Sequence, residues 1–318
     1  MTVMLIPCAG NIAIDMQAEF GPVPAALLPV GKDFALIEAL KPVVRHYTDV
    51  LVGFSNPQEF VQKTVNRHYD NVRIVDVGTT RSLGETIAAL LCKLPPETEA
   101  IGIQMGDAFH PSEKRGKDSI YYSMESALNR WVSFRYDTHS GISDVKMPGT
   151  SKSYSLGTAF AGKFEIHDVQ AFKDALDDSL NQPSPKIDPF YQAITKYFNS
   201  RSQAQGNFAT LLHESPAWID FGYSSSYFDY RRKVGFNSRS FNSLTFNEVK
   251  KSVTKRSRNR AKLNDEIAWY SELPSDLADL YPRIYSIGTE PENPWIETEY
   301  CTALPLDQLF MYSKLDES

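Results

Sequence analysis

Cysteine is scarce in this chain, and long apolar runs are missing. Cys8, Cys92 and Cys301 are odd in number and lie far apart, which argues against a disulfide framework and against a zinc site, so we expect reduced, packed thiols. The apolar segment 1–9 has no basic leader and turns polar within about ten residues, which is too short for a signal peptide or a membrane span. These absences predict a cytoplasmic protein without membrane insertion.

Positive charge is also in short supply. The formal net charge of -6 argues against a nucleic-acid scaffold or a membrane-surface binder as the main role. The run 250–262 holds seven Lys or Arg in thirteen positions but lacks the stacking aromatic residues of a nucleic-acid site. We expect small-molecule partners and no nucleic acid, and the sequence leaves a homo-oligomer open.

The hydrophobic pattern of the first 110 residues predicts an α/β fold. Short apolar runs alternate with helix-length amphipathic stretches, which is typical of a doubly wound, mostly parallel, Rossmann-like sheet. The predicted strands are 3–8, 50–54, 72–77 and 100–105, and the predicted helices are 34–46, 57–69 and 83–94. Ligands of such sheets bind beyond the carboxyl ends of the strands.

The rest of the chain predicts a β-rich insert and a second domain. Segments 120–122, 131–136, 142–145 and 154–161 indicate an antiparallel extension that could form one wall of a substrate pocket. The turn-prone stretch 236–243 marks a boundary, so we expect domains over 1–235 and 241–318, the second a small α+β segment. Further predicted helices are 168–180, 189–199, 224–234 and 259–273, and further predicted strands are 243–246, 248–254 and 295–300.

Two aspartates follow apolar runs. Asp107 comes directly after the strand predicted at 100–105, and Asp220 ends the run Ala217-Trp218-Ile219-Asp220. Carboxylates at strand ends can hold a divalent cation against phosphate oxygens, because hard cations prefer oxygen ligands. Two such residues could bind one Mg²⁺ and stabilise charge at a phosphorus centre under attack. Taken alone, Asp107 is equally well explained as a turn residue.

These aspartates belong to an ordered set of short motifs that resembles the nucleotidyltransferases that make sugar nucleotides. In chain order the motifs are Pro7-Cys8-Ala9-Gly10, the segment 24–30 (PAALLPV), Gly106-Asp107, the segment 157–162, and Trp218-Ile219-Asp220-Phe221-Gly222. The resemblance covers about residues 1–235. It implies that a nucleoside triphosphate and a phosphorylated sugar or small alcohol react with the help of Mg²⁺, and that pyrophosphate leaves.

The same resemblance implies roles for single residues. Asp107 and Asp220 match the aspartates that bind the metal. Gly157 matches a glycine near the sugar phosphate. The positions that match nucleotide-binding residues are Ala9, Gly10, Asn11, Gly84 and Glu85.

Both cations of that family are missing from their usual positions. The family's first loop ends in an arginine that grips the triphosphate, but this chain has Asp15 there and no arginine before Arg45. The family's Pro-Lys pair is Pro24-Ala25 in this chain. Losing two charged groups that stabilise a transition state, without replacement, should nearly abolish catalysis.

Three explanations remain for the missing charge. Lys32 could enter the site from the next turn as the catalytic cation. A basic residue of the β-rich insert could supply the charge instead, and Lys146, near the substrate, and Lys152 are the candidates. Otherwise the domain no longer catalyses. Each lysine can also be read as a solvated surface residue.

A second resemblance covers the end of the chain. Segments 253–257, 263–270 and 297–300 resemble the amino-terminal lobe of choline-kinase and aminoglycoside-phosphotransferase-like proteins. It implies that Lys255 meets ATP phosphates and pairs with Glu266. The alternative is an exposed lysine and a helix-surface glutamate. No catalytic loop follows before Ser318, so we expect either a truncated kinase domain or a packing module rather than phosphotransfer by this chain alone.

Two hypotheses of function follow from the sequence. The first is an enzyme that transfers a nucleoside monophosphate from an NTP to a phosphorylated sugar or small alcohol. The resemblance to fused transferase and kinase proteins places it in capsule or other surface-polysaccharide biosynthesis. The second is a non-catalytic nucleotide-binding or scaffolding subunit that has lost the catalytic arginine and lysine.

Overall fold

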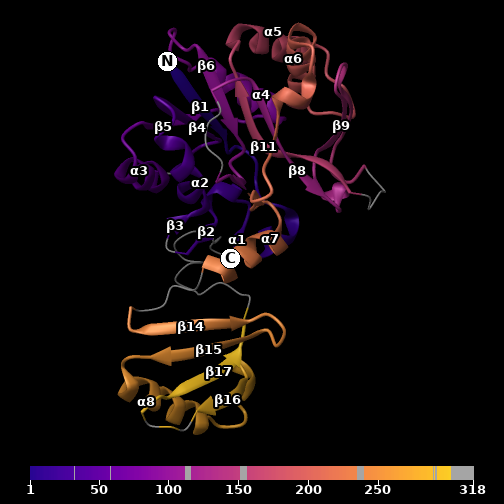
Figure 1. Cartoon of the computed structure of the whole chain (residues 1–318). Helices are drawn as coiled ribbons and strands as arrows, with labels where there is room; N and C mark the ends of the chain where they lie inside the picture. The colour runs from indigo at the N-terminus through magenta and orange to yellow at the C-terminus, as the bar shows by residue number, and fades with distance from the viewer. Residues whose placement is uncertain are drawn as a thin grey trace. The chain divides into compact units, whose positions relative to one another are not determined.

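The computed structural model describes residues 1–31, 33–57, 59–111, 116–150, 156–234, 240–288, 290 and 292–301. Packing divides them into two units (Figure 1). The first contains the described residues of Met1–Leu28 and Asp33–Ser226, and the second contains those of Pro29–Lys32 and Tyr227–Tyr312. Helix α7 (Ser224–Val234) begins in the first unit and continues into the second. The domain bounds 1–235 and 241–318 stay a prediction.

The first unit is built on four parallel strands. Their order is β6-β1-β4-β5, and Leu5 of β1 lies opposite Leu51 of β4 and Ile103 of β6. The strands are β1 (Thr2–Pro7), β4 (Asp49–Phe54), β5 (Val72–Asp76) and β6 (Ala100–Gln104). All four strands predicted from apolar runs are confirmed, each within one residue of its predicted ends.

Helices cover both faces of this sheet, as the sequence predicted (Figure 1). They are α2 (Ala35–Val44), α3 (Glu59–His68), α4 (Leu83–Leu91), α5 (Val169–Asn181) and α6 (Pro189–Gln205). Because strand side chains alternate between faces, Val3 and Leu5 join a core with α4, α5 and α6. Met4 and Ile6 join a second core with α2 and α3.

The predicted β-rich insert extends the sheet beside β6. Its strands are β8 (Ser119–Glu125), β9 (Ser133–Asp137), β10 (Gly141–Lys146) and β11 (Gly157–Ile166). β11 pairs antiparallel with β6, β8 and β9, and its register against β8 shifts between Phe160 and Phe164. Gly162 lies at this irregularity with φ +75°, a conformation that favours glycine. The start of the strand predicted at 154–161 falls partly outside the described residues.

Several short elements were not predicted. A strand pair, β7 (Ala108–Phe109) with β13 (Ile219–Asp220), lies outside the main sheet, and β12 (Leu212–Glu214) joins β8 in parallel. The others are α1 (Ile14–Phe20), β2 (Pro29–Val30), β3 (Asp33–Phe34), η1 (Ala25–Leu27), η2 (Leu128–Arg130) and η3 (Phe208–Leu211). Apart from α1, which has seven residues, these elements have two to four residues, which leave too little periodicity for a sequence pattern to detect.

The second unit contains a four-stranded antiparallel sheet with one main helix. The sheet order is β14-β15-β17-β16. Its elements are β14 (Asn242–Asn247), β15 (Ser252–Ser257), α8 (Arg260–Ser271), η4 (Ala278–Leu280), β16 (Ile284–Gly288) and β17 (Trp295–Glu299). The strand predicted at 248–254 is wrong in its bounds, because the chain turns at Lys251, which has φ +52°, and β15 begins only at Ser252.

The three cysteines and the helices test two further expectations. Cys8 is buried as predicted, whereas the expectation of packed thiols is wrong for Cys92 and Cys301, which are exposed. Within the described part of the chain, none of the helices combines the length and the hydropathy that a membrane crossing requires.

Asp188 joins the beginnings of two helices. Its carboxylate accepts hydrogen bonds from the backbone N–H groups of Leu83 (3.0 Å) and Gly84 (3.1 Å) in α4 and of Phe190 (2.8 Å) in α6. A helix leaves its first N–H groups without partners inside the helix, so one carboxylate here satisfies three of them. This junction fixes where α4 begins.

We expect Asp188→Ala to lower the free energy of unfolding by about 2 kcal/mol, because three backbone donors lose their acceptor. The measurement is urea unfolding followed by circular dichroism. The matched control is Asp178→Ala, which removes an exposed ion pair with Lys196 (2.5 Å) and should cost less than about 1 kcal/mol. Equal losses in the two variants would contradict this role of Asp188.

Candidate functional site

A cavity of ≈ 480 Å³ lies in the first unit. It is lined by residues that follow the carboxyl ends of β1 and β6, by residues of the β-rich insert and by residues around β13. Doubly wound sheets bind ligands beyond the carboxyl ends of their strands, so this is where a substrate is expected.

The pairing of β7 with β13 brings the two predicted aspartates together. Asp107 immediately precedes β7, and Asp220 is the last residue of β13, opposite Ala108. The backbone N–H of Phe221 donates to the carbonyl oxygen of Asp107 (2.6 Å). This hydrogen bond ties together two segments that are more than a hundred positions apart in the sequence.

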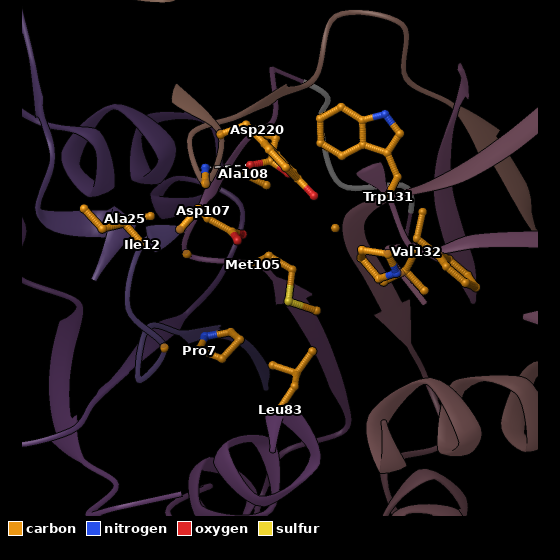
Figure 2. A pocket seen from close by; sticks show the side chains of 18 of the residues that line it. Pro7, Ile12, Ala25, Leu83, Met105, Asp107, Ala108, Trp131, Val132 and Asp220 are labelled. Atoms are coloured by element: carbon orange, nitrogen blue, oxygen red, sulfur yellow. Dashed lines mark hydrogen bonds between the residues drawn. The ribbon is translucent and has the colours of Figure 1, made fainter. Parts of the chain in front are cut away.

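Both carboxylates line the cavity. In Figure 2 they point into a space with Ile12 and Ala25 on one side and Trp131 on the other. Asp107 is open to the solvent in the cavity, although protein surrounds its carboxylate. The two groups are therefore accessible to a ligand that enters from solution.

Two glycines allow the close approach. A side chain at Gly106 would place its Cβ 2.3 Å from the Sγ of Cys8, so this turn requires glycine in order to lie against the end of β1. A Cβ at Gly222 would lie 2.9 Å from Oδ1 of Asp220 and 3.4 Å from Oδ2 of Asp107. Glycine at 222 thus leaves open the space directly between the carboxylates.

Electrostatics at this point disfavour two negative charges. Loss of solvation raises the pKa of both Asp107 and Asp220. The charge of Asp107 raises the pKa of Asp220 further, while the Gly222 N–H, which donates to Asp220 (2.6 Å), and the positive charge of Arg130 oppose the increase. A divalent cation between the carboxylates would remove this repulsion.

The loop after β1 forms the wall on the side of Ala25. Gly10 and Asn11 line the cavity, whereas Ala9 is not among the described lining residues. Asp15, the acid at the expected arginine position, is also absent from the lining, and its carboxylate accepts a hydrogen bond from Ser224 Oγ (2.7 Å). Ala25 does line the cavity, at the position where the resemblance implied a lysine.

Three other predicted residues have structural partners outside the cavity wall. A Cβ at Gly84 would lie 2.9 Å from Cβ of Pro189, so this glycine lets α4 pack against α6. Glu85 accepts a hydrogen bond from the Arg81 N–H (2.7 Å) at the start of α4. A Cβ at Gly157 would lie 2.7 Å from Cδ1 of Leu128, so Gly157 supports η2. None of the three is among the described lining residues.

The predicted lysines do not supply the missing charge in the described structure. Lys146 is 41% exposed, pairs with Asp144 (3.6 Å) and does not line the cavity. Lys32 and Lys152 lie outside the described residues. Their roles stay predictions.

Sequence reasoning missed Arg130, which is the one cationic side chain among the described residues that line the cavity. Its guanidinium lies over the rings of Trp131 (5.0 Å) and Tyr223 (4.5 Å). Nη2 donates to Ser225 Oγ (3.0 Å), and the Tyr223 hydroxyl donates to the Arg130 carbonyl oxygen. Arg130 directly precedes the strand predicted at 131–136, so a search of the turns beside the insert strands would have found it.

Aromatic side chains surround Arg130. Trp131 packs edge to face against Trp218 (5.0 Å between ring centroids) and Tyr223 (5.1 Å). All three line the cavity, as does Tyr191 of α6. Aromatic packing of this kind fixes ring positions and gives the cavity a rigid apolar wall next to its charged groups.

The predicted pair in the second unit is in contact. Nζ of Lys255, in β15, donates to both carboxylate oxygens of Glu266, in α8, at 2.8 and 2.6 Å. Both side chains are partly exposed. A strand lysine and a helix glutamate thus meet as the kinase-like resemblance implied, while the ATP site itself stays a prediction.

The raised pKa values predict a pH-dependent stability. The folded state holds a proton on the aspartate pair more tightly than the unfolded chain does, so stability falls as the pH rises from about 4, the pKa of an unfolded carboxyl group, through the raised pKa. Because cavity water screens the pair, we expect Asp220→Asn to gain only about 1 kcal/mol at pH 7.5 in EDTA.

Urea unfolding between pH 4 and pH 7.5 measures this gain, which should shrink toward about zero at the acidic end of the range. The control is Asp144→Asn, an exposed carboxylate in the same unit, which should show no such trend. An Asp220→Asn variant that is less stable than the unsubstituted chain at pH 7.5 would contradict repulsion between the two aspartates.

No protein-family model and no curated protein sequence matches the chain. Solved structures do match. A UDP-glucose pyrophosphorylase bound to UDP-glucose has a TM-score of 0.55 and 12% identity, over 74% of this chain and 98% of that one. A nucleoside-diphosphate-sugar pyrophosphorylase from Vibrio cholerae has a TM-score of 0.53 and 15% identity, over 73% of this chain and 100% of that one.

A CTP:phosphocholine cytidylyltransferase from Streptococcus pneumoniae has a TM-score of 0.52 and 10% identity, over 74% of this chain and 99% of that one. Identities this low show the fold alone. The chain therefore contains a nucleotidyltransferase-like, Rossmann-type α/β fold, in agreement with the fold expected from the sequence.

Proposed function

We propose that the first unit transfers a nucleoside monophosphate from an NTP to a phosphorylated sugar or small alcohol and releases pyrophosphate. The observation that carries this proposal is the meeting of Asp107 and Asp220 in the wall of one cavity, at the end of a nucleotidyltransferase-like sheet. The fold by itself would not suffice, since folds host many functions and the site has to be argued from its own residues.

The two aspartates fit a bound Mg²⁺. They are hard oxygen donors, their negative charges repel each other, and Gly222 leaves the space beside them open. Within the described residues, no cluster of three or more His, Cys, Asp or Glu could hold a metal. Mg²⁺ is commonly held by one or two carboxylates together with substrate phosphates, so the NTP would complete this site.

In the proposed reaction an oxygen of the acceptor phosphate attacks the α-phosphorus of the NTP. The bond between the α-phosphorus and the oxygen that bridges to the β-phosphorus breaks, and pyrophosphate leaves. Asp107 and Asp220 would hold a Mg²⁺, which would supply positive charge to the phosphate oxygens. Gly10 and Asn11 contact the nucleotide from the loop after β1. The site excludes part of the bulk water through its aromatic wall.

The nucleotide, the acceptor and the pathway are finer proposals. NTPs and sugar phosphates are cytoplasmic metabolites, which fits a cytoplasmic location. Assembly of a capsule or another surface polysaccharide consumes activated units of this chemical type, which supports that role. A homo-oligomer remains compatible with the chain.

A specific observation favours a second candidate function. Asp15 points its carboxylate at Ser224, and Ala25 puts a methyl group in the cavity, so neither position supplies a cation to the triphosphate. A subunit that binds nucleotide without catalysis would have this pattern. It would show NTP-dependent thermal stabilisation and no pyrophosphate release.

We expect Asp107→Asn and Asp220→Asn each to lower the rate of pyrophosphate release at least about 100-fold, because each variant loses a charged metal ligand. The assay combines each NTP with Mg²⁺ and a panel of phosphorylated sugars and alcohols. Asp144→Asn, whose carboxylate lies outside the cavity, serves as the control and should keep full activity.

Pyrophosphate release that persists in both aspartate variants would overturn the proposed metal site. If the unsubstituted chain releases no pyrophosphate with any substrate pair but is stabilised by an NTP with Mg²⁺, the binding subunit replaces the enzyme. Absence of both effects would contradict the two functions together.

For the second unit we propose a kinase-lobe-like module that binds ATP beside the Lys255–Glu266 ion pair. The support is that a strand lysine and a helix glutamate form a bidentate contact in a four-stranded antiparallel sheet with one main helix. In kinases this pair positions the lysine on the nucleotide phosphates.

The test uses the full chain with Asp107→Asn and Asp220→Asn, so that metal-assisted binding at the first site is removed. We expect saturation-transfer NMR to detect ATP on this protein and to lose most of the signal when Lys255→Met is added. Arg260→Met, which breaks an exposed ion pair with Glu292 in the same unit, is the control and should keep the signal. Equal signals from the two variants would contradict the proposal.

A further inference from the structure

The charges that line the cavity are unbalanced. Two carboxylates and one guanidinium lie in its described wall, while both proposed substrates are polyanions. One Mg²⁺ compensates the carboxylates but leaves the added phosphate charge largely unmatched. Any fixed cation in the wall therefore has a large effect on where a phosphate can bind.

Arg130 is held in one position by contacts on several sides. Its guanidinium carbon lies over the rings of Trp131 and Tyr223, which pack against each other, and Nη2 donates to Ser225 Oγ. A guanidinium has five N–H donors, so two ring contacts and one hydrogen bond leave N–H donors for a ligand. Because the aromatic contacts hold the fork in place, a phosphate would order few additional torsions on binding.

The position of Arg130 in the fold indicates which phosphate it meets. It ends η2 and directly precedes Trp131, which Figure 2 shows on the side of the cavity away from Ile12 and Ala25. Gly10 and Asn11, which directly precede Ile12 in the loop after β1, also line the cavity. Arg130 lies close enough to Asp220 for its charge to favour the ionised carboxylate there.

We propose that Arg130 binds the phosphate of the acceptor substrate through the edge of its guanidinium. Trp131 and Tyr223 act as positioning residues that hold the guanidinium. The inference rests on the proposed function for the identity of the acceptor, but the phosphate site itself is testable without turnover.

Isothermal titration calorimetry with inorganic phosphate and Mg²⁺ tests the site directly. Loss of a charge-assisted hydrogen bond should weaken phosphate binding about 10-fold or more in Arg130→Met. Lys146→Met, a second cation of the insert that lies outside the cavity wall, should bind phosphate like the unsubstituted chain. Arg130→Lys keeps the charge and loses the planar guanidinium, so its phosphate affinity should lie between those of Arg130→Met and the unsubstituted chain.

Equal phosphate affinities of Arg130→Met and the unsubstituted chain would overturn the proposal, and so would a failure of the unsubstituted chain to bind phosphate at millimolar concentration. Thermal unfolding shows whether Arg130→Met is folded. If it is not, Arg130→Lys decides, because an unchanged affinity in that variant also overturns the proposal.

Turnover separates this inference from the proposed function. In an active enzyme, Arg130→Met should raise the KM for the phosphorylated acceptor about 10-fold and leave the KM for the NTP within about two-fold. A rise in the KM for the NTP alone would overturn the assignment to the acceptor. The chain could bind phosphate through Arg130 and still release no pyrophosphate. That result would contradict the proposed function and support the phosphate site at Arg130.

Discussion

Repulsion between two carboxylates that face the same cavity is the constraint on which the rest of the site depends. Asp107 and Asp220 each have a raised pKa because they have lost solvation, and the charge of Asp107 adds to the effect at Asp220. A folded chain tolerates such a pair when a ligand compensates it. The structure thus holds an unfavourable interaction that the binding of a cation would relieve.

The fold holds this pair together through small local devices. Pairing of β7 with β13 fixes the two backbones, and the Phe221 N–H bonds to the Asp107 carbonyl. Gly106 and Gly222 are needed because a Cβ at either position would collide with neighbouring atoms of the site. A rigid support of this kind lets carboxylates remain close despite their repulsion, because the backbone cannot relax away from it.

The β-rich insert contributes more than a wall. It brings Arg130 to a cavity whose first loop contributes no cation to the described lining, and the rings of Trp131 and Tyr223 contact the guanidinium there. Charge needed at a phosphate site can come from any segment that reaches it, since electrostatic stabilisation depends on position in space and not on position in the sequence. The loss of a motif residue is therefore not by itself evidence that a site is silent.

The amino-acid sequence determined the strands and helices of the sheet, because apolar periodicity reports directly which face of an element is buried. It also singled out Asp107, Asp220 and the pair Lys255 and Glu266, because these residues stand in ordered short motifs. Only the tertiary structure decided that the aspartates meet and that Arg130 lines the cavity where Lys146 does not. Those facts depend on distances between residues far apart in the chain, which no local pattern encodes.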